Sequence, residues 1–318
     1  MILSELPSIP FHHPAPRPSA MTITLLQTAI RPHHPEQACE AALRLIDEAP
    51  HSDLYLLPEM WATGFLTRPT EATARAATQA SRLMQRVATE RQCAVAGSVA
   101  IPPDESEAHG ATTPDAAAAG GWRNRFFFYL PDGTAPYYDK QHLFAYGGED
   151  LSFSPGEGPR DVEYKGLRFR LQTCFDLRFP ETARNHSRQP YDVLLYTAGW
   201  PASRRSVWDI LLQARAIENQ AFCIGVNSTQ LPPTATASQA AVTAGAENAT
   251  SSQAAATTGA REATERPAPQ VVYDGGSAVV DPYGRLIARL DAAEQAYTFS
   301  PDIDRMTHLR HKFPVLQP

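Results

Sequence analysis

The sequence feature that most constrains the fold is the stretch at residues 168–180, RFRLQTCFDLRFP, where an alternating pattern leads directly into a cysteine. The alternation predicts a β-strand up to Thr173, and Pro180 then opens a helical pattern. Cys174 therefore stands at a sharp bend between a strand and a helix. Such a bend presents a side chain and neighbouring backbone N–H groups to a pocket, and a following helix N-terminus is expected to lower the thiol pKa. Because most cysteines are small buried apolar residues, the importance of Cys174 depends on the rest of the chain.

Short apolar strand patterns alternate with amphipathic helical patterns along the chain. Helices are predicted over 35–49, 71–92, 180–187 and 203–220. Strands are predicted over 22–28, 53–57, 93–101, 123–130, 168–173, 192–197, 221–227, 277–281, 286–290 and 296–300. Turn signals such as Pro131, Asp132 and Gly133 indicate hairpins as well. This combination predicts a mixed α/β domain of layered sheets and helices, not a purely parallel sheet.

Three segments do not fit this pattern. Residues 1–20 are rich in proline, and we expect a disordered extension before Met21 opens the first strand pattern. Residues 102–121 and 231–270 lose all periodicity and are dominated by small and polar residues, so we expect two flexible insertions. One domain is therefore expected over 21–300. A basic, aromatic tail follows over 301–318, and we expect it at a dimer interface.

Composition excludes several classes of function. With a formal net charge of -6 and no long basic run, the chain is not expected to bind nucleic acid or an anionic membrane surface. No apolar run approaches the roughly 20 residues that a membrane span needs. The 4 cysteines lie far apart without a CxxC pair, which argues against a disulfide framework or a metal site and fits a reducing, cytoplasmic compartment. GxGxxG, Walker and GxSxG motifs are absent from the sequence.

Three apolar strand patterns end in residues of complementary chemistry. Glu59 follows LYLLP, Lys140 follows YYD, and Cys174 follows LQT. Singly, Glu59 fits a surface carboxylate, Lys140 a solvated charge and Cys174 a core residue. Together they supply a base that takes the thiol proton, a cation that stabilises an oxyanion, and a nucleophile. A second thiol chemistry is open here, in which Cys174 pairs with His142 or His186.

The segments PEMWATGF, YDKQHLF and CFDLRFPE resemble the glutamate, lysine and cysteine motifs of the nitrilase superfamily of carbon–nitrogen hydrolases. The resemblance runs in order from about Met21 to Ser300. WPASRRSVW, ARAIENQ and the HKFP of the tail are similar to the omega-amidase branch, whose members hydrolyse ω-amides of α-keto acids such as 2-oxoglutaramate. Relatives in this branch often carry Asn at the position of Gly199 and Asp at that of Gly276.

The resemblance implies a four-layer αββα sandwich that pairs with a second copy as a homodimer. It implies that Cys174 is the nucleophile, Glu59 the general base, and Lys140 the oxyanion-binding residue together with the backbone N–H of Phe175. Glu149 matches a second glutamate that positions substrate or water. Arg178, Arg204 and the neighbouring Arg205 are candidates for binding a substrate carboxylate, and Trp200 for lining the pocket.

The implied reaction is hydrolysis of a small carboxamide by water through a cysteine thioester, without a metal or an organic cofactor. The expected reaction is that of an omega-amidase. The alternatives are another amidase of the family, a nitrilase, a carbamoylase, or a non-catalytic binding protein that kept the fold. Retention of Glu59, Lys140 and Cys174 together argues against the non-catalytic alternative.

Overall fold

The computed structural model describes residues 21–103, 121–231 and 271–316. The extension expected at 1–20 lies outside these residues, as do the expected insertions at 102–121 and 231–270 except for their end residues. Within the described part of the chain, no helix is long and apolar enough to cross a bilayer.

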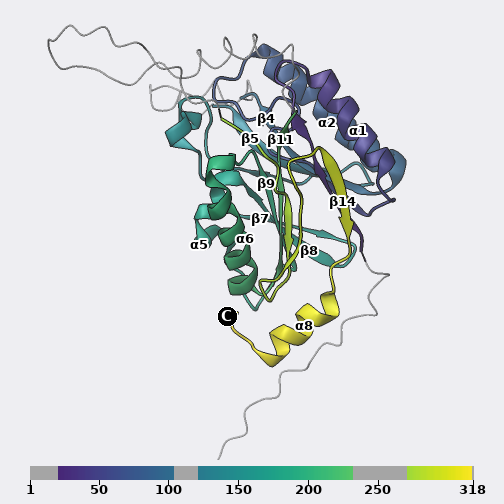
Figure 1. Cartoon of the computed structure of the whole chain (residues 1–318), viewed down its shortest axis with the longest axis vertical. Helices are drawn as coiled ribbons and strands as arrows, with labels where there is room; N and C mark the ends of the chain where they lie inside the picture. Colours follow the sequence, from purple (N-terminus) through teal and green to yellow (C-terminus); the bar gives the residue numbers. More distant parts are fainter. Residues whose placement is uncertain (1–20, 104–120, 232–270, 317–318) are drawn as a thin grey trace, which may run out of the picture.

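Two six-stranded mixed sheets form the centre of the protein (Figure 1). The first has the order β14-β1-β3-β4-β5-β6, and the second has the order β13-β12-β10-β9-β8-β7. The strands of the first sheet are β1 Ile23–Gln27, β3 Leu54–Leu56, β4 Ala94–Ile101, β5 Arg123–Tyr129, β6 Tyr137–Asp139 and β14 Gln295–Phe299. Those of the second are β7 Arg160–Tyr164, β8 Leu167–Thr173, β9 Val193–Ala198, β10 Phe222–Asn227, β12 Ala278–Val280 and β13 Leu286–Arg289. A short pair, β2 Ala29–Ile30 and β11 Thr229–Gln230, adds a two-stranded parallel sheet.

Helices cover the outer faces of both sheets (Figure 1). The α-helices are α1 Pro35–Glu48, α2 Glu71–Arg91, α5 Pro180–Ala183, α6 Arg205–Asn219 and α8 Ile303–Lys312. Short 3₁₀ segments are η2 Ala145–Gly147, η3 Glu149–Leu151, η4 Cys174–Arg178 and η5 Ala202–Arg204. Pro35 opens α1, and Gln92 and Gln220 end α2 and α6 in the left-handed conformation that closes many helices.

The central strands bury side chains on both faces, which places the sheets between the helix layers. In β3, Leu54 and Leu56 point into the core between the two sheets, whereas Tyr55 packs with α1 and α2. In β9, Val193 belongs to the inner core and Leu194 packs with α6. Because successive side chains of a strand face opposite ways, this alternation produces the layers helix, sheet, sheet, helix. The expected four-layer αββα sandwich is confirmed.

Most predicted elements are present, with three informative differences. The helix predicted over 180–187 is only the single turn α5, because Arg184 leaves the helical conformation with ψ 124. The tail contains the helix α8, which packs on its own chain. Arg310 donates to the backbone oxygens of Tyr191 (2.6 Å) and Gln220 (2.9 Å). Strand β7 was not predicted, because its many charged residues obscure the alternation of apolar and polar residues that indicates a strand.

Gly225 lets α6 approach β10 closely. A Cβ at Gly225 would lie 2.4 Å from the Trp208 side chain and 2.9 Å from that of Leu212. We therefore expect Gly225→Ala to lower the free energy of unfolding by about 1–3 kcal/mol through overpacking. Chemical denaturation measures this change. Gly158→Ala is the control, because nothing lies within 4 Å of its Cβ position. Equal stability of the two variants would contradict close packing of α6.

Candidate active site

The ends of strands from both sheets bring Glu59, Lys140 and Cys174 together. Glu59 follows β3 of the first sheet by three residues, and Cys174 follows β8 of the second directly. Lys140 follows β6, and its backbone N–H donates to the Asn124 carbonyl (3.0 Å). Glu59 and Lys140 are fully buried, and Cys174 is 9% exposed. Ligand sites of α/β proteins form where parallel strands end, as β3 and β8 do here.

The two oxygens of Glu59 have different partners. Its Oε1 accepts from Lys140 Nζ (2.9 Å) and from Asn124 Nδ2 (2.7 Å). Its Oε2 accepts from the backbone N–H of Gly199 (2.9 Å), the residue directly after β9. The Glu59 carboxylate lies close enough to the Cys174 thiol to raise the pKa of that thiol. Both lone pairs of Oε1 therefore accept hydrogen bonds, whereas Oε2 keeps one lone pair that is able to accept a proton.

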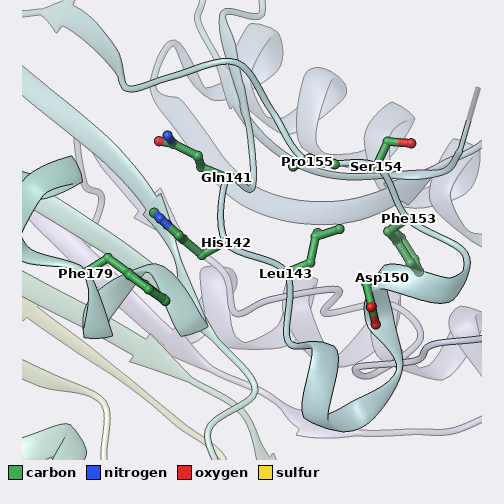
Figure 2. A pocket seen from close by; sticks show the side chains of 8 residues that line it. All are labelled: Gln141, His142, Leu143, Asp150, Phe153, Ser154, Pro155 and Phe179. Carbon is green, nitrogen blue, oxygen red and sulfur yellow. The ribbon is translucent and has the colours of Figure 1, made fainter. Parts of the chain in front are cut away.

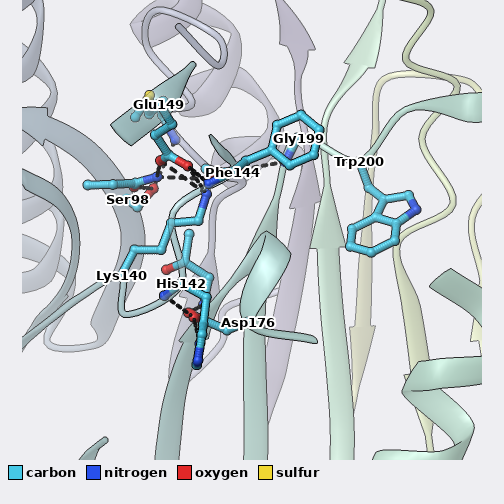
Figure 3. A network of polar contacts seen from close by, with 12 residues as sticks. Ser98, Lys140, His142, Phe144, Glu149, Asp176, Gly199 and Trp200 are labelled. Atoms are coloured by element: carbon cyan, nitrogen blue, oxygen red, sulfur yellow. Dashed lines mark hydrogen bonds and ion pairs between the residues drawn. The ribbon is translucent and has the colours of Figure 1, made fainter. Parts of the chain in front are cut away.

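Glu149 binds the same lysine (Figure 3). Its Oε2 accepts from Lys140 Nζ (2.8 Å) and from the backbone N–H of Phe144 (2.6 Å). Its Oε1 accepts from Lys140 Nζ (3.1 Å) and Asn124 Nδ2 (3.1 Å). The structure thus joins all four expected polar residues, and two buried carboxylates hold one buried ammonium.

The backbone at Cys174 has a φ of +45°. Residues other than glycine rarely adopt this left-handed region, and such strain concentrates at functional sites. Asp176 holds the turn, because its carboxylate accepts from the backbone N–H of Thr173 (2.9 Å) and from Tyr138 Oη (2.8 Å). It also accepts from the backbone N–H of His142 (2.8 Å). Asp176 thereby connects the cysteine turn to the segment that follows Lys140.

The charged groups of the site shift the pKa values of Cys174 and Lys140, and for each residue burial and neighbouring charges contribute to the shift. Burial and the nearby Glu59 carboxylate raise the pKa of the Cys174 thiol well above its usual value, although Lys140 opposes this effect. The expected lowering of this pKa by a helix is wrong, because α5 has only one turn and the thiol faces a carboxylate. Burial disfavours the charge of Lys140, but Glu149, Glu59 and Cys174 together raise its pKa above the usual value. Lys140 is therefore an ammonium and Cys174 a thiol at neutral pH.

Aromatic side chains surround the cluster and bring in the candidate arginines. Lys140 Nζ lies 5.3 Å from the centre of the Phe65 ring, and Phe144 packs edge-on against Phe175 at 5.2 Å. The Arg204 guanidinium lies 5.1 Å from the Phe144 ring, and the exposed Arg178 lies 5.5 Å from the ring of the buried Trp200.

The remaining candidates lie elsewhere. Arg205 forms an ion pair with Asp274. His142 stacks on Phe179 at 3.7 Å and directs Nδ1 at Asp176 (3.0 Å), and His186 is exposed. The described residues show no contact between either histidine and Cys174, so the geometry does not favour a Cys–His pair.

A separate open pocket of about 450 Å³ lies beside the segment that follows Lys140 (Figure 2). Its lining residues are Gln141, His142, Leu143, Asp150, Phe153, Ser154, Pro155 and Phe179, without Glu59 or Cys174. In the described ranges, no group of three or more His, Cys, Asp or Glu residues is arranged to hold a metal ion.

Sequence reasoning missed the neutral residues that orient the charged ones. Asn124 bridges Glu59 and Glu149, and its Oδ1 accepts from Ser98 Oγ (3.0 Å). Ser98 Oγ in turn accepts from the backbone N–H of Met60 (2.9 Å). One signal was available, because Asn124 shares a strand face with Phe126 and Phe128, where a polar residue is unusual. The roles of Gly199 and Ser98 had no such signal.

The electrostatics predict the behaviour of the thiol when Glu59 is neutralised. Glu59→Gln removes the negative charge that raises the Cys174 pKa and leaves Lys140, which lowers it. The midpoint of the pH profile of Cys174 alkylation by iodoacetamide should therefore move to lower pH. Mass spectrometry identifies the labelled residue. Burial also raises the pKa of Cys39 and Cys93 to about 11 and raises that of Cys223, so the profile is followed on the Cys174 peptide alone. A profile that stays in place or moves upward would contradict this electrostatic coupling.

Comparison with known proteins identifies the family of the chain. The carbon-nitrogen hydrolase family matches residues 22–309. Omega-amidase YafV of Yersinia enterocolitica is 39% identical over 183 residues, covering 58% of this chain and 64% of that protein. Omega-amidase YafV of Escherichia coli K12 is 32% identical over 269 residues, covering 83% of each chain.

The fold is also that of solved members of the family. The structure of XC1258 from Xanthomonas campestris, a CN-hydrolase superfamily protein with an arsenic adduct in its active site, has a TM-score of 0.69 and 28% identity. The match covers 93% of this chain and 96% of XC1258. The chain belongs to the carbon–nitrogen hydrolase family, the nitrilase superfamily, and its sequence relatives include the omega-amidase branch.

Proposed function

We propose that the protein is an omega-amidase that hydrolyses a small carboxamide to a carboxylate and ammonia through a thioester on Cys174. The observation that carries this proposal is the shared burial of Glu59, Lys140 and Cys174 at the ends of three strands, where Lys140 pairs with Glu59 and both charges act on the Cys174 thiol. The omega-amidase relatives and the similarity of the segments WPASRRSVW and ARAIENQ to that branch support the substrate class.

In the first half of the reaction, Cys174 forms the thioester. Glu59 takes the thiol proton as Sγ attacks the amide carbon, because the thiol itself is not ionised. Lys140 and the backbone N–H of Phe175 stabilise the oxyanion of the tetrahedral intermediate. The C–N bond breaks when Glu59 passes its proton to the nitrogen, and ammonia leaves.

In the second half, water hydrolyses the thioester. Glu59 takes a proton from the water, whose oxygen bonds to the acyl carbon. The C–S bond breaks, and the proton returns to Sγ. Glu149 acts through Lys140 in both halves, because its oxygens are occupied by Lys140, Asn124 and Phe144. No step of this scheme requires a cofactor.

The substrate's far carboxylate requires a cation. Arg178 and Arg204 are the candidates, because both side chains are exposed while their guanidinium groups rest on aromatic rings of the site wall. Trp200 connects them, since its Nε1 donates to the Arg204 carbonyl (2.8 Å) and its ring lies beneath Arg178. Guanidinium groups bind carboxylates through paired, charge-assisted hydrogen bonds.

A substrate panel with ammonia detection tests this function. We expect the highest kcat/KM with 2-oxoglutaramate, compared with glutamine, a simple nitrile and an N-carbamoyl amino acid. Cys174→Ala should lower the rate at least about 1,000-fold, because the nucleophile is lost. Arg178→Ala or Arg204→Ala should raise KM about 10-fold to 100-fold for 2-oxoglutaramate but not for an uncharged amide.

Arg188→Ala is the matched control, because Arg188 is an exposed arginine that lies outside the site. Ammonia release that persists in Cys174→Ala would remove Cys174 from the mechanism. A preference for the nitrile or the carbamoyl compound would favour the alternative activities. A wild-type protein without activity on the panel would favour a binding protein.

We also propose that the protein is a homodimer that pairs through the outer face of α6. Ile210 and Ile217 lie two helical turns apart on α6 and are 63% and 53% exposed. Leu286 of β13 and Phe313 of the tail are also exposed, and Gln220 Nε2 at the end of α6 donates to the Phe313 carbonyl (2.7 Å). These four exposed apolar residues, on α6 and on the segments near it, are called the α6 patch here. Exposed apolar patches of this kind mark interaction surfaces.

Ile210→Asp tests the dimer. A charge in the centre of a buried interface is strongly unfavourable, so the variant should elute as a monomer in size-exclusion chromatography with light scattering. Leu151→Asp is the control, because Leu151 is 78% exposed but lies outside the α6 patch. A wild-type monomer, or a dimer that persists in Ile210→Asp, would contradict pairing through α6.

A further inference from the structure

Tyr273 lies beside the reacting groups, although neither half of the proposed reaction uses it. A Cβ at Gly199 would lie 3.7 Å from Cε1 of the Tyr273 ring and 3.6 Å from Oε2 of Glu59. The ring is therefore on the Oε2 side of the carboxylate. Lys140 and Asn124 occupy the Oε1 side.

The backbone around Tyr273 is held by several parts of the fold. The N–H of Tyr273 donates to Gln230 Oε1 (3.3 Å), and the Val272 carbonyl accepts from the N–H of Ala202 (2.8 Å). Asn227 Nδ2 donates to the carbonyl of Gly275 (2.7 Å), and Asp274 pairs with Arg205. These contacts fix the segment on both sides of Tyr273, so the ring is a preformed wall of the site.

The Tyr273 hydroxyl has a raised pKa and no hydrogen-bond partner among the described residues. Burial, Cys174 and Glu59 raise the pKa of the phenol, since each disfavours a phenolate. Within residues 21–103, 121–231 and 271–316, the hydroxyl makes no hydrogen bond, whereas the buried phenol of Tyr138 is bonded to Asp176. A partly buried phenol without a protein partner is suited to a small polar molecule that occupies the site during the reaction.

The Oε2 atom of Glu59 is the oxygen available for the water. In the part of the chain that the structure describes, Oε1 accepts two hydrogen bonds, from a cation and an amide, whereas Oε2 accepts one, from the N–H of Gly199. A water that gives its proton to Glu59 therefore lies on the Oε2 side, the side of Tyr273. Glu149 is not a candidate for this place, because its two oxygens already accept four hydrogen bonds.

We propose that the hydroxyl of Tyr273 holds the hydrolytic water against Oε2 of Glu59 while the Cys174 thioester is cleaved. This inference rests on the proposed amidase function. The water oxygen bonds to the acyl carbon, the C–S bond breaks, and one water proton passes to Oε2 and then to Sγ. Tyr273 neither gains nor loses a proton. It is a positioning residue that fixes the direction of the water's lone pair.

Partition of the thioester between water and hydroxylamine tests the role of Tyr273. With 2-oxoglutaramate and a fixed hydroxylamine concentration, wild type and Tyr273→Phe each yield carboxylate and hydroxamate, which are quantified by mass spectrometry. Loss of one hydrogen bond to the water should raise the ratio of hydroxamate to carboxylate about 10-fold in the variant. Attack of hydroxylamine on the thioester depends less on a general base than attack of water does, because hydroxylamine is the stronger nucleophile. The thioester adduct on Cys174 should also accumulate in intact-protein spectra.

The controls distinguish failure of the water-positioning role of Tyr273 from failure of the proposed amidase function. Tyr283→Phe makes the same change at a tyrosine on the turn between β12 and β13, and its ratio should equal that of wild type. An unchanged ratio in Tyr273→Phe, or a higher KM alone, overturns the water-positioning role. A large drop in Tm of that variant also overturns it, because the hydroxyl then has a structural partner. Absence of carboxylate and ammonia from wild type would instead refute the amidase function.

Discussion

The site depends on the buried ion cluster of Lys140 with Glu59 and Glu149. Each of these charges is fully buried and would be unfavourable alone, because desolvation of an ion costs several kcal/mol. Their mutual contacts of 2.8–2.9 Å and the donors from Asn124 and Phe144 offset that cost. The cluster fixes the base and the cation in one arrangement, so the reacting groups need little reorganisation when substrate binds.

The layered fold supplies this cluster with partners from distant parts of the sequence. Glu59 and Asn124 come from the first sheet and Cys174 and Gly199 from the second. Because the inner faces of both sheets share one apolar core, their strand ends cannot shift independently. The strained backbone of Cys174 is held in the same way, since Asp176 connects its turn to Tyr138 of β6.

The sequence allowed the strands, the layered fold and the charged residues of the site to be predicted, because alternating apolar residues and long motifs are local signals. The neutral partners were not predictable in this way. Asn124 acts on a carboxylate 65 positions away, and Gly199 acts through its backbone N–H, which every residue but proline has. The length of α5 depends on how the chain turns at Arg184, which the helical pattern over 180–187 does not encode.

Gly199 explains why the two sides of the Glu59 carboxylate differ. A Cβ there would lie 3.3 Å from Phe65 Cβ, a tight contact, and 3.6 Å and 3.7 Å from Glu59 Oε2 and Tyr273 Cε1, so little space is left at this wall. In this chain the glycine gives Oε2 one backbone donor and leaves room for the Tyr273 ring. Gly199 and Tyr273 are therefore neighbours at the site, although they lie 74 positions apart in the sequence.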